Sequence, residues 1–251
     1  MEGHELVAAK AREVSYAARY IVNAYPAVYM PLARIRHRDC DDWAVSAATE
    51  LVIEGFGRSG STFAVLAFEL AQARRVRSAH HSHAAAQIIS AARLSVPTLV
   101  IVRDPDSAVV AHMVRRGIPA VLPLKAWIRY HERITSYREA FVAARLESVA
   151  SDFGAVTRAV NAKFGTGFEE FRHTSQNEAR VFDTIERLNH RRFDGAVTSE
   201  RFRALARPTP EREERKRAVR GELESHRLAE LRARAWRVYR TLVPEPGPRD
   251  G

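Results

Sequence analysis

The stretch LVIEGFGRSGSTFAVLAF (residues 51–68) constrains the fold more than any other part of the chain. It begins as a short apolar run typical of a buried strand, passes through Gly55, Gly57 and Gly60, and continues with helix-forming residues. A strand, a tight glycine turn and a helix in this order expose successive backbone N–H groups at the positive end of the helix. The sequence therefore predicts an α/β fold with an anion-binding loop over residues 55–62.

Short strand and helix patterns alternate through the middle of the chain. PTLVIVRDP (97–105) predicts a strand buried on both faces, RRVRSAH (74–80) a second strand, and HAAAQIISAARL (83–94) a helix between them. FVAARLESVAS (141–151) predicts a further strand, after which Asp152 is expected to cap a helix that ends at a glycine. This alternation predicts a P-loop-type three-layer fold, with a central parallel sheet, helices on both faces and extra helices at both termini.

A helical pattern beginning at Leu124 carries Trp127, Ile134 and Phe141 at spacings of seven, which predicts a stripe that faces the core. Residues 5–37 also have helical composition, interrupted by two prolines, and residues 208–240 predict a loop and two charged helices. We expect one domain over residues 1–243, made of a helical N-terminal extension (1–48), a core (49–168) and C-terminal helices (169–243), followed by a disordered tail (244–251).

The chain of 251 residues has a formal net charge of +10; four of its 40 basic residues are lysines, which leaves 36 arginines. Such an excess favours an anionic partner, whether nucleic acid, an acidic membrane surface or a phosphorylated ligand, although an arginine- and alanine-rich composition also follows from coding bias. The sequence has no helix-turn-helix, zinc or aromatic-stacking motif that supports specific binding of nucleic acid. A single cysteine, Cys40, and the lack of a secretory pattern predict a cytoplasmic protein.

The glycine loop lacks the residue on which most nucleotide-binding loops depend. The spacing from Gly55 to Gly60 matches G-x-x-x-x-G-K-[ST], but Ser61 stands in place of the lysine and is followed by Thr62. In nucleotide-hydrolysing enzymes that lysine reaches the β- and γ-phosphates, and the hydroxyl residue holds magnesium. The only cation inside this loop is Arg58, whose guanidinium can bind an anionic oxygen bidentately. The loop thus favours phosphate binding, and the missing lysine argues against magnesium-dependent ATP or GTP chemistry.

Two segments resemble one family. GFGRSGSTF resembles the 5′-phosphosulfate loop of the sulfotransferases that use 3′-phosphoadenosine 5′-phosphosulfate (PAPS), whose pattern is roughly [K/R]-S-G-[T/S/N]-T-[W/F/L]. VIVRDPDSAVVAHMVRR resembles the family's 3′-phosphate segment: Arg103, Asp104 and Pro105 match, and Ala111 stands where the family has a serine, with His112 and Arg115 as alternatives for that contact. Residues 147–168 are similar to the family's strand-to-helix stretch after the acceptor region.

The resemblance implies a bacterial-type P-loop enzyme that binds PAPS without a metal and releases adenosine 3′,5′-bisphosphate. The cofactor-binding residues that it implies are Gly55, Gly57, Arg58, Ser59, Gly60, Ser61, Thr62, Arg103 and Ala111, with Arg58 also in a catalytic role. A basic segment near the C-terminus closes over the 3′-phosphate in this family, and EREERKRAVRG (211–221) is the comparable stretch, with Arg212 and Lys216 as the implied contacts. An exposed Arg/Glu-rich helix is the alternative reading of that stretch.

Sulfuryl transfer needs a base to take the proton of the acceptor. RSAHHSH lies at the end of the second predicted strand, where many family members carry Lys-[Thr/Ser]-His with the histidine as base, so the resemblance implies His81, then His83, then His80. Glu69 is a further candidate. A solvated turn and a metal site are the alternatives for this cluster, and the lack of a cysteine or carboxylate at ligand spacing argues against zinc.

The sequence thus predicts a sulfotransferase that moves the sulfuryl group of PAPS to a hydroxyl or amine by metal-free in-line transfer. The expected acceptor is a small molecule, a glycan or a lipid-like molecule, and peripheral contact with an anionic membrane is compatible with the charge. Two alternatives stay open: another P-loop nucleotide enzyme, kinase-like, with Asp104 as its magnesium ligand, and a non-catalytic sulfotransferase-like nucleotide-binding protein.

Overall fold

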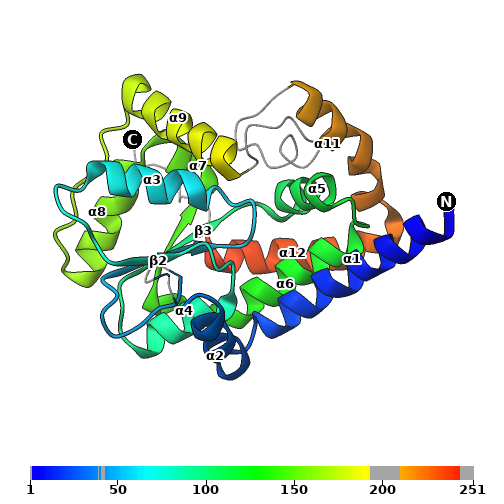
Figure 1. Ribbon diagram of the computed structural model, residues 1–251, viewed down its shortest axis with the longest axis horizontal. Coiled ribbons are helices and arrows are strands. Elements are labelled where there is room, and N and C mark those ends of the chain that lie inside the picture. Colours follow the sequence, from blue (N-terminus) through cyan, green and yellow to red (C-terminus); the bar gives the residue numbers. More distant parts are fainter. Residues whose placement is uncertain (1, 39, 41–42, 193–209, 244–251) are drawn as a thin grey trace.

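A computed structural model describes residues 2–38, 40, 43–192 and 210–243, and the side chains from residue 7 onward. At the centre of these residues four strands pair in parallel in the order β2-β1-β3-β4 (Figure 1). The strands are β1 (Leu51–Gly55), β2 (Ser78–His80), β3 (Thr98–Val102) and β4 (Val142–Arg145). The predicted α/β fold with a central parallel sheet is confirmed.

Alternate residues of the two central strands face opposite helical layers, because successive side chains of a strand point to opposite faces. Leu51, Ile53, Leu99 and Ile101 belong to the core on one face. The helices of that layer are α3 (Ser61–Ala71), α7 (Leu146–Ser151), α8 (Phe153–Phe164) and α9 (Ser175–Arg192). Both faces of the sheet are therefore covered, as the continuously apolar strand sequences predict.

The second layer is the thicker one, because it includes helices from both ends of the chain (Figure 1). Within it, α1 and α12 both pack against α6, and α11 packs against α5. Its helices are α1 (Glu2–Val22), α2 (Pro26–Arg36), α4 (Ala85–Arg93), α5 (Pro105–Arg116), α6 (Val121–Thr135), α11 (Pro210–Leu223) and α12 (Ala229–Leu242), with a 3-10 turn, η2 (His226–Leu228), before α12. No helix in the described ranges is long and apolar enough to span a bilayer.

The prediction that one helical stripe carries Trp127, Ile134 and Phe141 is correct for the first two residues and wrong for Phe141. Trp127 and Ile134 lie on α6 and are fully buried, as predicted. Phe141 is also fully buried but lies beyond the helix, after the 3-10 turn η1 (Arg138–Ala140) and just before β4. Phe141 is seven residues after Ile134 and belongs to the same core, but it reaches that core from an extended segment and not from the helix.

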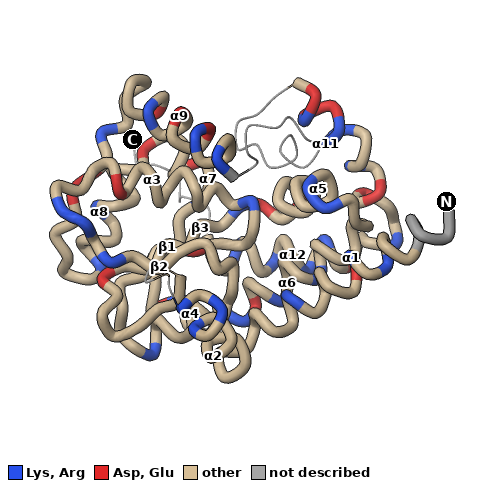
Figure 2. Tube along the Cα trace, in the orientation of Figure 1, with Lys and Arg blue, Asp and Glu red and all other residues tan. Residues whose placement is uncertain are grey.

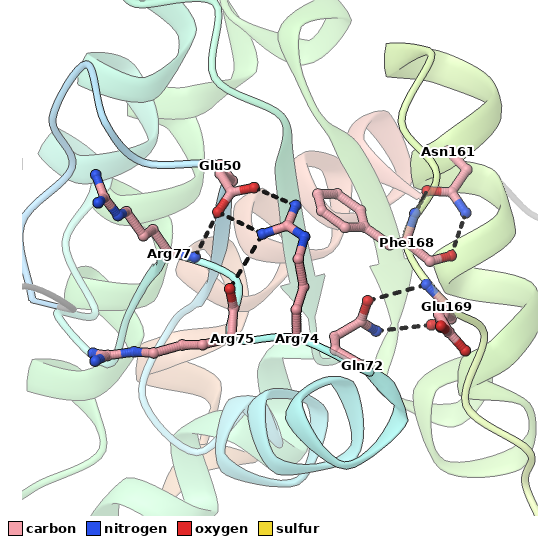
Figure 3. Close-up of polar contacts among 8 residues, drawn as sticks. All are labelled: Glu50, Gln72, Arg74, Arg75, Arg77, Asn161, Phe168 and Glu169. Carbon is pink, nitrogen blue, oxygen red and sulfur yellow. Dashed lines mark hydrogen bonds and ion pairs between the residues drawn. The ribbon is translucent and has the colours of Figure 1, made fainter.

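Two predicted strands are shorter than expected. β2 pairs over only three residues, because the N–H of Arg77 goes to a carboxylate oxygen of Glu50 rather than continuing the ladder (Figure 3). After β4 the chain does not stay extended: Leu146 is half-buried and Val149 fully buried, which is the spacing of a helix face, and residues 146–151 form α7. The predicted cap of the next helix is confirmed, since Asp152 Oδ1 accepts a hydrogen bond from the N–H of Ala155 at 2.9 Å and the helix ends at left-handed Gly165.

Side-chain hydrogen bonds join the segments that follow α3 and α8 (Figure 3). Gln72 pairs with the backbone of Glu169 in both directions, at 2.9 and 3.0 Å. Asn161 bonds both backbone groups of Phe168 and the hydroxyl of Thr166. The loop over residues 166–169 is therefore held by two amide side chains rather than by regular structure. The predicted loop before α11 and the predicted tail lie outside the described residues, in 193–209 and 244–251.

Replacement of Asn161 by alanine removes three hydrogen bonds at once and leaves the half-buried N–H and C=O groups of Phe168 without partners. We expect the Asn161→Ala variant to lose about 2 kcal/mol of unfolding free energy in urea denaturation. The control is Thr241→Ala on α12, whose hydroxyl bonds only a carbonyl of its own helix and whose loss costs about 0.5 kcal/mol or less. Equal effects of the two substitutions would contradict this assignment.

Candidate active site

The glycine loop and the segment that begins at Arg103 meet at the point in the sheet where the strand order reverses. β1 and β3 are neighbours, but the chain leaves β1 toward β2 on one side and leaves β3 toward β4 on the other. In open parallel sheets the crevice for ligands forms at the carboxyl ends of two such strands. The glycine loop follows β1 and Arg103 follows β3, and Arg103 Nη1 donates a hydrogen bond to the carbonyl oxygen of Arg58 at 3.0 Å.

The loop has the geometry of an anion cradle. β1 ends at Gly55, and Ser61 begins α3 after Gly60, whose φ of 88° is in the left-handed region. No side chain caps the start of α3, and the N–H groups of a first helical turn have no acceptor within the helix. Their partial positive charge adds to that of the helix dipole. Gly55 is required by close packing, since a Cβ there would lie 2.6 Å from the carbonyl oxygen of Ile101.

A buried histidine clamps the loop from the other layer. His112 Nε2–H donates to the carbonyl oxygen of Gly57 at 2.8 Å, and the hydroxyl of Tyr16 on α1 donates to His112 Nδ1 at 3.1 Å. Burial lowers the pKa of His112 to about 3, so the ring stays neutral in this tautomer. With both ring nitrogens bonded, His112 is not available for a phosphate. The side chain of Ala111 is buried in α5 and is not among the residues that line the cleft.

A cleft of about 1200 Å³ runs past the loop, and cations dominate its walls. Figure 2 shows basic residues on α5 and a mixture of basic and acidic residues on α11, and both helices contribute basic side chains to the cleft. Among the described residues that line it, Glu178 is the one acidic side chain. The basic ones are Arg19, Arg36, Arg58, Arg103, Arg115, Arg116, Arg212 and Lys216. The predicted cofactor contacts that line this one cleft, although they are far apart in the sequence, are Gly57, Arg58, Gly60, Ser61, Thr62, Arg103, Arg212 and Lys216. The predicted contacts Gly55 and Ser59 do not line it.

Arg58 lies at the centre of this charge. Burial, and after it the neighbouring guanidinium groups of Arg212, Arg115 and Arg103, together lower its pKa to about 9. Arg212 is itself only 3% exposed. Like charges at about 4 Å repel by about 1 kcal/mol in water and about 4 kcal/mol near a protein surface. An anion bound among these groups replaces that repulsion with attraction, so the cluster favours a ligand with several negative charges.

The histidine cluster forms the adjoining wall. His81 Nε2 lies 3.3 Å from the hydroxyl oxygen of Thr62, and its Nδ1 lies 2.6 Å from Nδ1 of His80. His83 Nδ1–H donates to the carbonyl oxygen of Gly55 at 2.9 Å. His81 and His83 line the cleft, and burial lowers their pKa values to about 3 and 4, so both rings are neutral at physiological pH.

The backbone is strained at the loop and the histidine turn. Arg58, His81 and His83 have positive φ angles of 69°, 62° and 50°, and they are three of the four such non-glycine residues in the described part of the chain. Conformations of this kind persist only where surrounding contacts impose them, and they concentrate at functional sites. Within the described ranges no group of three or more His, Cys, Asp or Glu side chains is placed to hold a metal ion.

Glu54 holds the histidine turn and was not among the predicted site residues. It is the fourth residue of β1 and is fully buried, and its two carboxylate oxygens accept the N–H groups of Ser82 at 2.8 Å and His83 at 3.0 Å. Burial raises its pKa to about 7 in spite of these bonds, each of which lowers the pKa. A charged residue inside an apolar strand, one position before the glycine loop, is the sequence signal that marks it.

Other residues that line the cleft were also not among the predicted site residues. Tyr20, Asn23, Tyr29 and Trp43 come from α1, α2 and the segments that follow these helices, and Phe182 comes from α9. Trp43 stacks on His37 with ring centroids 4.0 Å apart. Nothing local marks these residues as site residues, because their place in the cleft depends on how the N-terminal helices pack over the sheet.

Comparison with known proteins finds matches among solved structures. No family model matches the chain, and no curated protein matches its sequence. The solved structures that match include that of mouse sulfotransferase SULT7A1 complexed with PAP; the match covers 80% of this chain and 92% of that chain, with 11% sequence identity and a TM-score of 0.38.

The raised pKa of Glu54 predicts a pH-dependent stability difference between the wild type and Glu54→Gln. Between pH 4.5 and about 7 the unfolded chain loses the Glu54 proton while the folded chain keeps it, so wild-type stability should fall relative to the variant as pH rises. The difference between 4.5 and about 7 corresponds to about 3 kcal/mol. Urea denaturation of both proteins at pH 4, 5.5, 7 and 8, each ± about 0.1 unit, measures the change.

Glu50 provides a control of opposite sign. Its bond to Arg74 lowers its pKa to about 2. The stability difference between the wild type and Glu50→Gln should therefore stay constant from about pH 5 to 8 and shrink only when the series is extended below pH 4.5. A stability difference for Glu54→Gln that stays constant over the whole pH range would show that burial does not raise the pKa of Glu54.

Proposed function

We propose that the protein is a sulfotransferase that moves the sulfuryl group of PAPS to a hydroxyl or amine acceptor. The observation that supports this most is the group of guanidiniums around an uncapped glycine loop, with Arg58 buried at its centre and Ser61 in place of the usual lysine. A site with several fixed cations and no lysine at that position suits a nucleotide held by arginines and backbone N–H groups.

The two ends of PAPS would meet different parts of the cleft. The N–H groups of the loop, Arg58 and the hydroxyl of Thr62 would hold the 5′-phosphosulfate, and Arg103, Arg212 and Lys216 would hold the 3′-phosphate. The residues fit such a ligand, because a volume of about 1200 Å³ and eight cations against one acid leave room and charge for a nucleotide and an acceptor together.

PAPS would supply a sulfuryl group attached to a phosphate leaving group. Arg58 and the first-turn N–H groups of α3 would stabilise the charge on the phosphate oxygens as the acceptor oxygen replaces that phosphate on sulfur. These donors are already fixed by Arg103 at the Arg58 carbonyl and by His112 at the Gly57 carbonyl. The arrangement therefore needs little reorganisation during transfer.

In this proposal His81 takes the acceptor proton. When its Nδ1–H donates to His80 Nδ1, its Nε2 carries a lone pair that faces Thr62 and the cleft. A proton that arrives at Nε2 is then shared along the Nδ1–Nδ1 bond, and His80 Nε2 lies 3.9 Å from the carboxylate of Glu69. In this arrangement His81 is the base, and His80 positions it through the bond between their Nδ1 atoms.

The kinase-like alternative loses support from the position of Asp104. Its carboxylate caps α5 by accepting the N–H of Ser107 at 2.8 Å, and the next acidic residue, Asp106, pairs with Arg232 at 2.7 Å. Both carboxylates are therefore used within the fold. The non-catalytic alternative differs from the proposal only in turnover, so binding and transfer have to be measured separately.

Adenosine 3′,5′-bisphosphate should stabilise the protein in a thermal-shift assay, by roughly 5–10 °C at about 100 times its Kd. The shift should exceed that given by ATP with magnesium, and Arg103→Ala should abolish it. Arg158→Ala removes the same charge from an exposed pair with Glu170 away from the cleft and should leave the shift intact. A larger shift with ATP and magnesium would overturn the sulfotransferase proposal.

Transfer itself is tested with PAPS labelled in the sulfuryl group and a panel of phenols, sugars and hydroxylated amphiphiles. We expect His81→Ala to lower the rate about 100-fold or more, because it removes the base, while the shift with adenosine 3′,5′-bisphosphate is kept. An unchanged rate would exclude His81 as the base. Binding without transfer to any acceptor in the panel would favour the non-catalytic alternative.

A further inference from the structure

The exposed apolar side chains of the protein are concentrated on its first two helices. Among the described residues ten large hydrophobic side chains are exposed, and seven of them lie between residues 7 and 35. The most exposed are Ile35 at 73% and Val7 at 69%. Single exposed apolar residues are normal on a soluble protein, but a concentration of this kind marks an interaction surface.

The seven residues form a stripe along each helix. Val7, Val14 and Ile21 are spaced by seven, so they share one face of α1, and the opposite face carries the buried Tyr16 and Tyr20. Each helix thus has one apolar face inside the fold and a second one outside it.

The same pattern holds on α2, where Val28, Leu32 and Ile35 share the outer face and Met30 and Ala33 are buried. Tyr25, between the helices, is also exposed. We name the outer residues Val7, Val14, Ile21, Tyr25, Val28, Leu32 and Ile35 the α1–α2 stripe.

The segment that carries this stripe is positively charged. Residues 7–38 contain Lys10, Arg12, Arg19, Arg34, Arg36 and Arg38 against a single acidic residue, Glu13, a net charge of +5 apart from the histidine. Apolar side chains flanked by arginines and lysines are the pattern by which helices lie on an anionic bilayer. A second copy of this chain is a poor occupant by comparison, because two such faces placed together would bring like charges into contact.

The stripe also adjoins the cleft. Leu32 belongs to both the stripe and the cleft wall, and Arg36, Ala18 and Arg19 line the cleft from the same two helices. We propose that the α1–α2 stripe docks on an anionic lipid bilayer, with its apolar side chains in the boundary between headgroups and acyl chains and its basic residues at the level of the phosphates. The mouth of the cleft then opens beside the membrane. This inference stands on the exposed surface and does not rest on the proposed sulfotransferase activity.

The test uses the full chain and co-sedimentation with vesicles of phosphatidylcholine that contain about 30% phosphatidylglycerol. We expect the wild type to bind these vesicles at least about tenfold more strongly than pure phosphatidylcholine vesicles, and less strongly as salt is raised. The double variant Val28→Ser, Ile35→Ser should bind at least about tenfold more weakly than the wild type. The matched control is Leu94→Ser, Leu188→Ser, which removes two apolar side chains exposed outside the stripe and should bind like the wild type.

Three results of the vesicle experiment would overturn the proposal. They are no binding of the wild type to the anionic vesicles, equal binding to neutral vesicles, and equal weakening in the control variant. A solution mass that doubles with concentration in the wild type but not in Val28→Ser, Ile35→Ser would also overturn it, since the stripe would then be an interface between two copies. The thermal melting temperature of each variant, compared with the wild type, shows that any lost binding does not come from unfolding.

Discussion

The parallel pairing of β1 with β3 is the constraint on which the site depends. It puts the carboxyl ends of two strands side by side, so the loop after one strand and Arg103 after the other must share a crevice. The helices from the two ends of the chain then close the crevice, bringing Arg212 from one end and Tyr16 from the other. Burial and packing hold together positive charges that would separate in solution, and the folded protein therefore carries an electrostatic cost that an anion removes.

The sequence predicts the parts of this structure that are encoded locally. The glycine loop, the buried strand before Arg103 and the Asp152 cap each depend on a few adjacent residues, and the rule that parallel strands end at one edge brings the first two together. Phe141 and the residues of α7 were assigned to the wrong elements, because an apolar spacing of seven or a short mixed run fits both helix and strand. Whether these residues form helix or strand is decided by the part of the core against which their side chains pack.

The hydrogen bonds that hold the site residues in place could not be predicted from local sequence patterns. Glu54 bonds the histidine turn only because β1 and β2 pair in a register that places their ends together, and His112 reaches the Gly57 carbonyl only because Tyr16 on α1 holds its other side. Such contacts join residues far apart in the sequence, and a single sequence contains no local signal for them. The charge of Glu54 is a partial exception, since a carboxylate in a buried strand has to have partners.

The left-handed backbone at His81 has a consequence for how this site can change over generations. Glycine, asparagine and aspartate adopt that conformation readily, whereas β-branched residues do not. A single substitution to one of the former would therefore keep the turn, the Glu54 hydrogen bonds and the anion cradle while removing the imidazole. With His81 as the base that we propose, one such substitution would remove turnover and keep ligand binding, so the fold and the proposed chemistry could be inherited separately at this position.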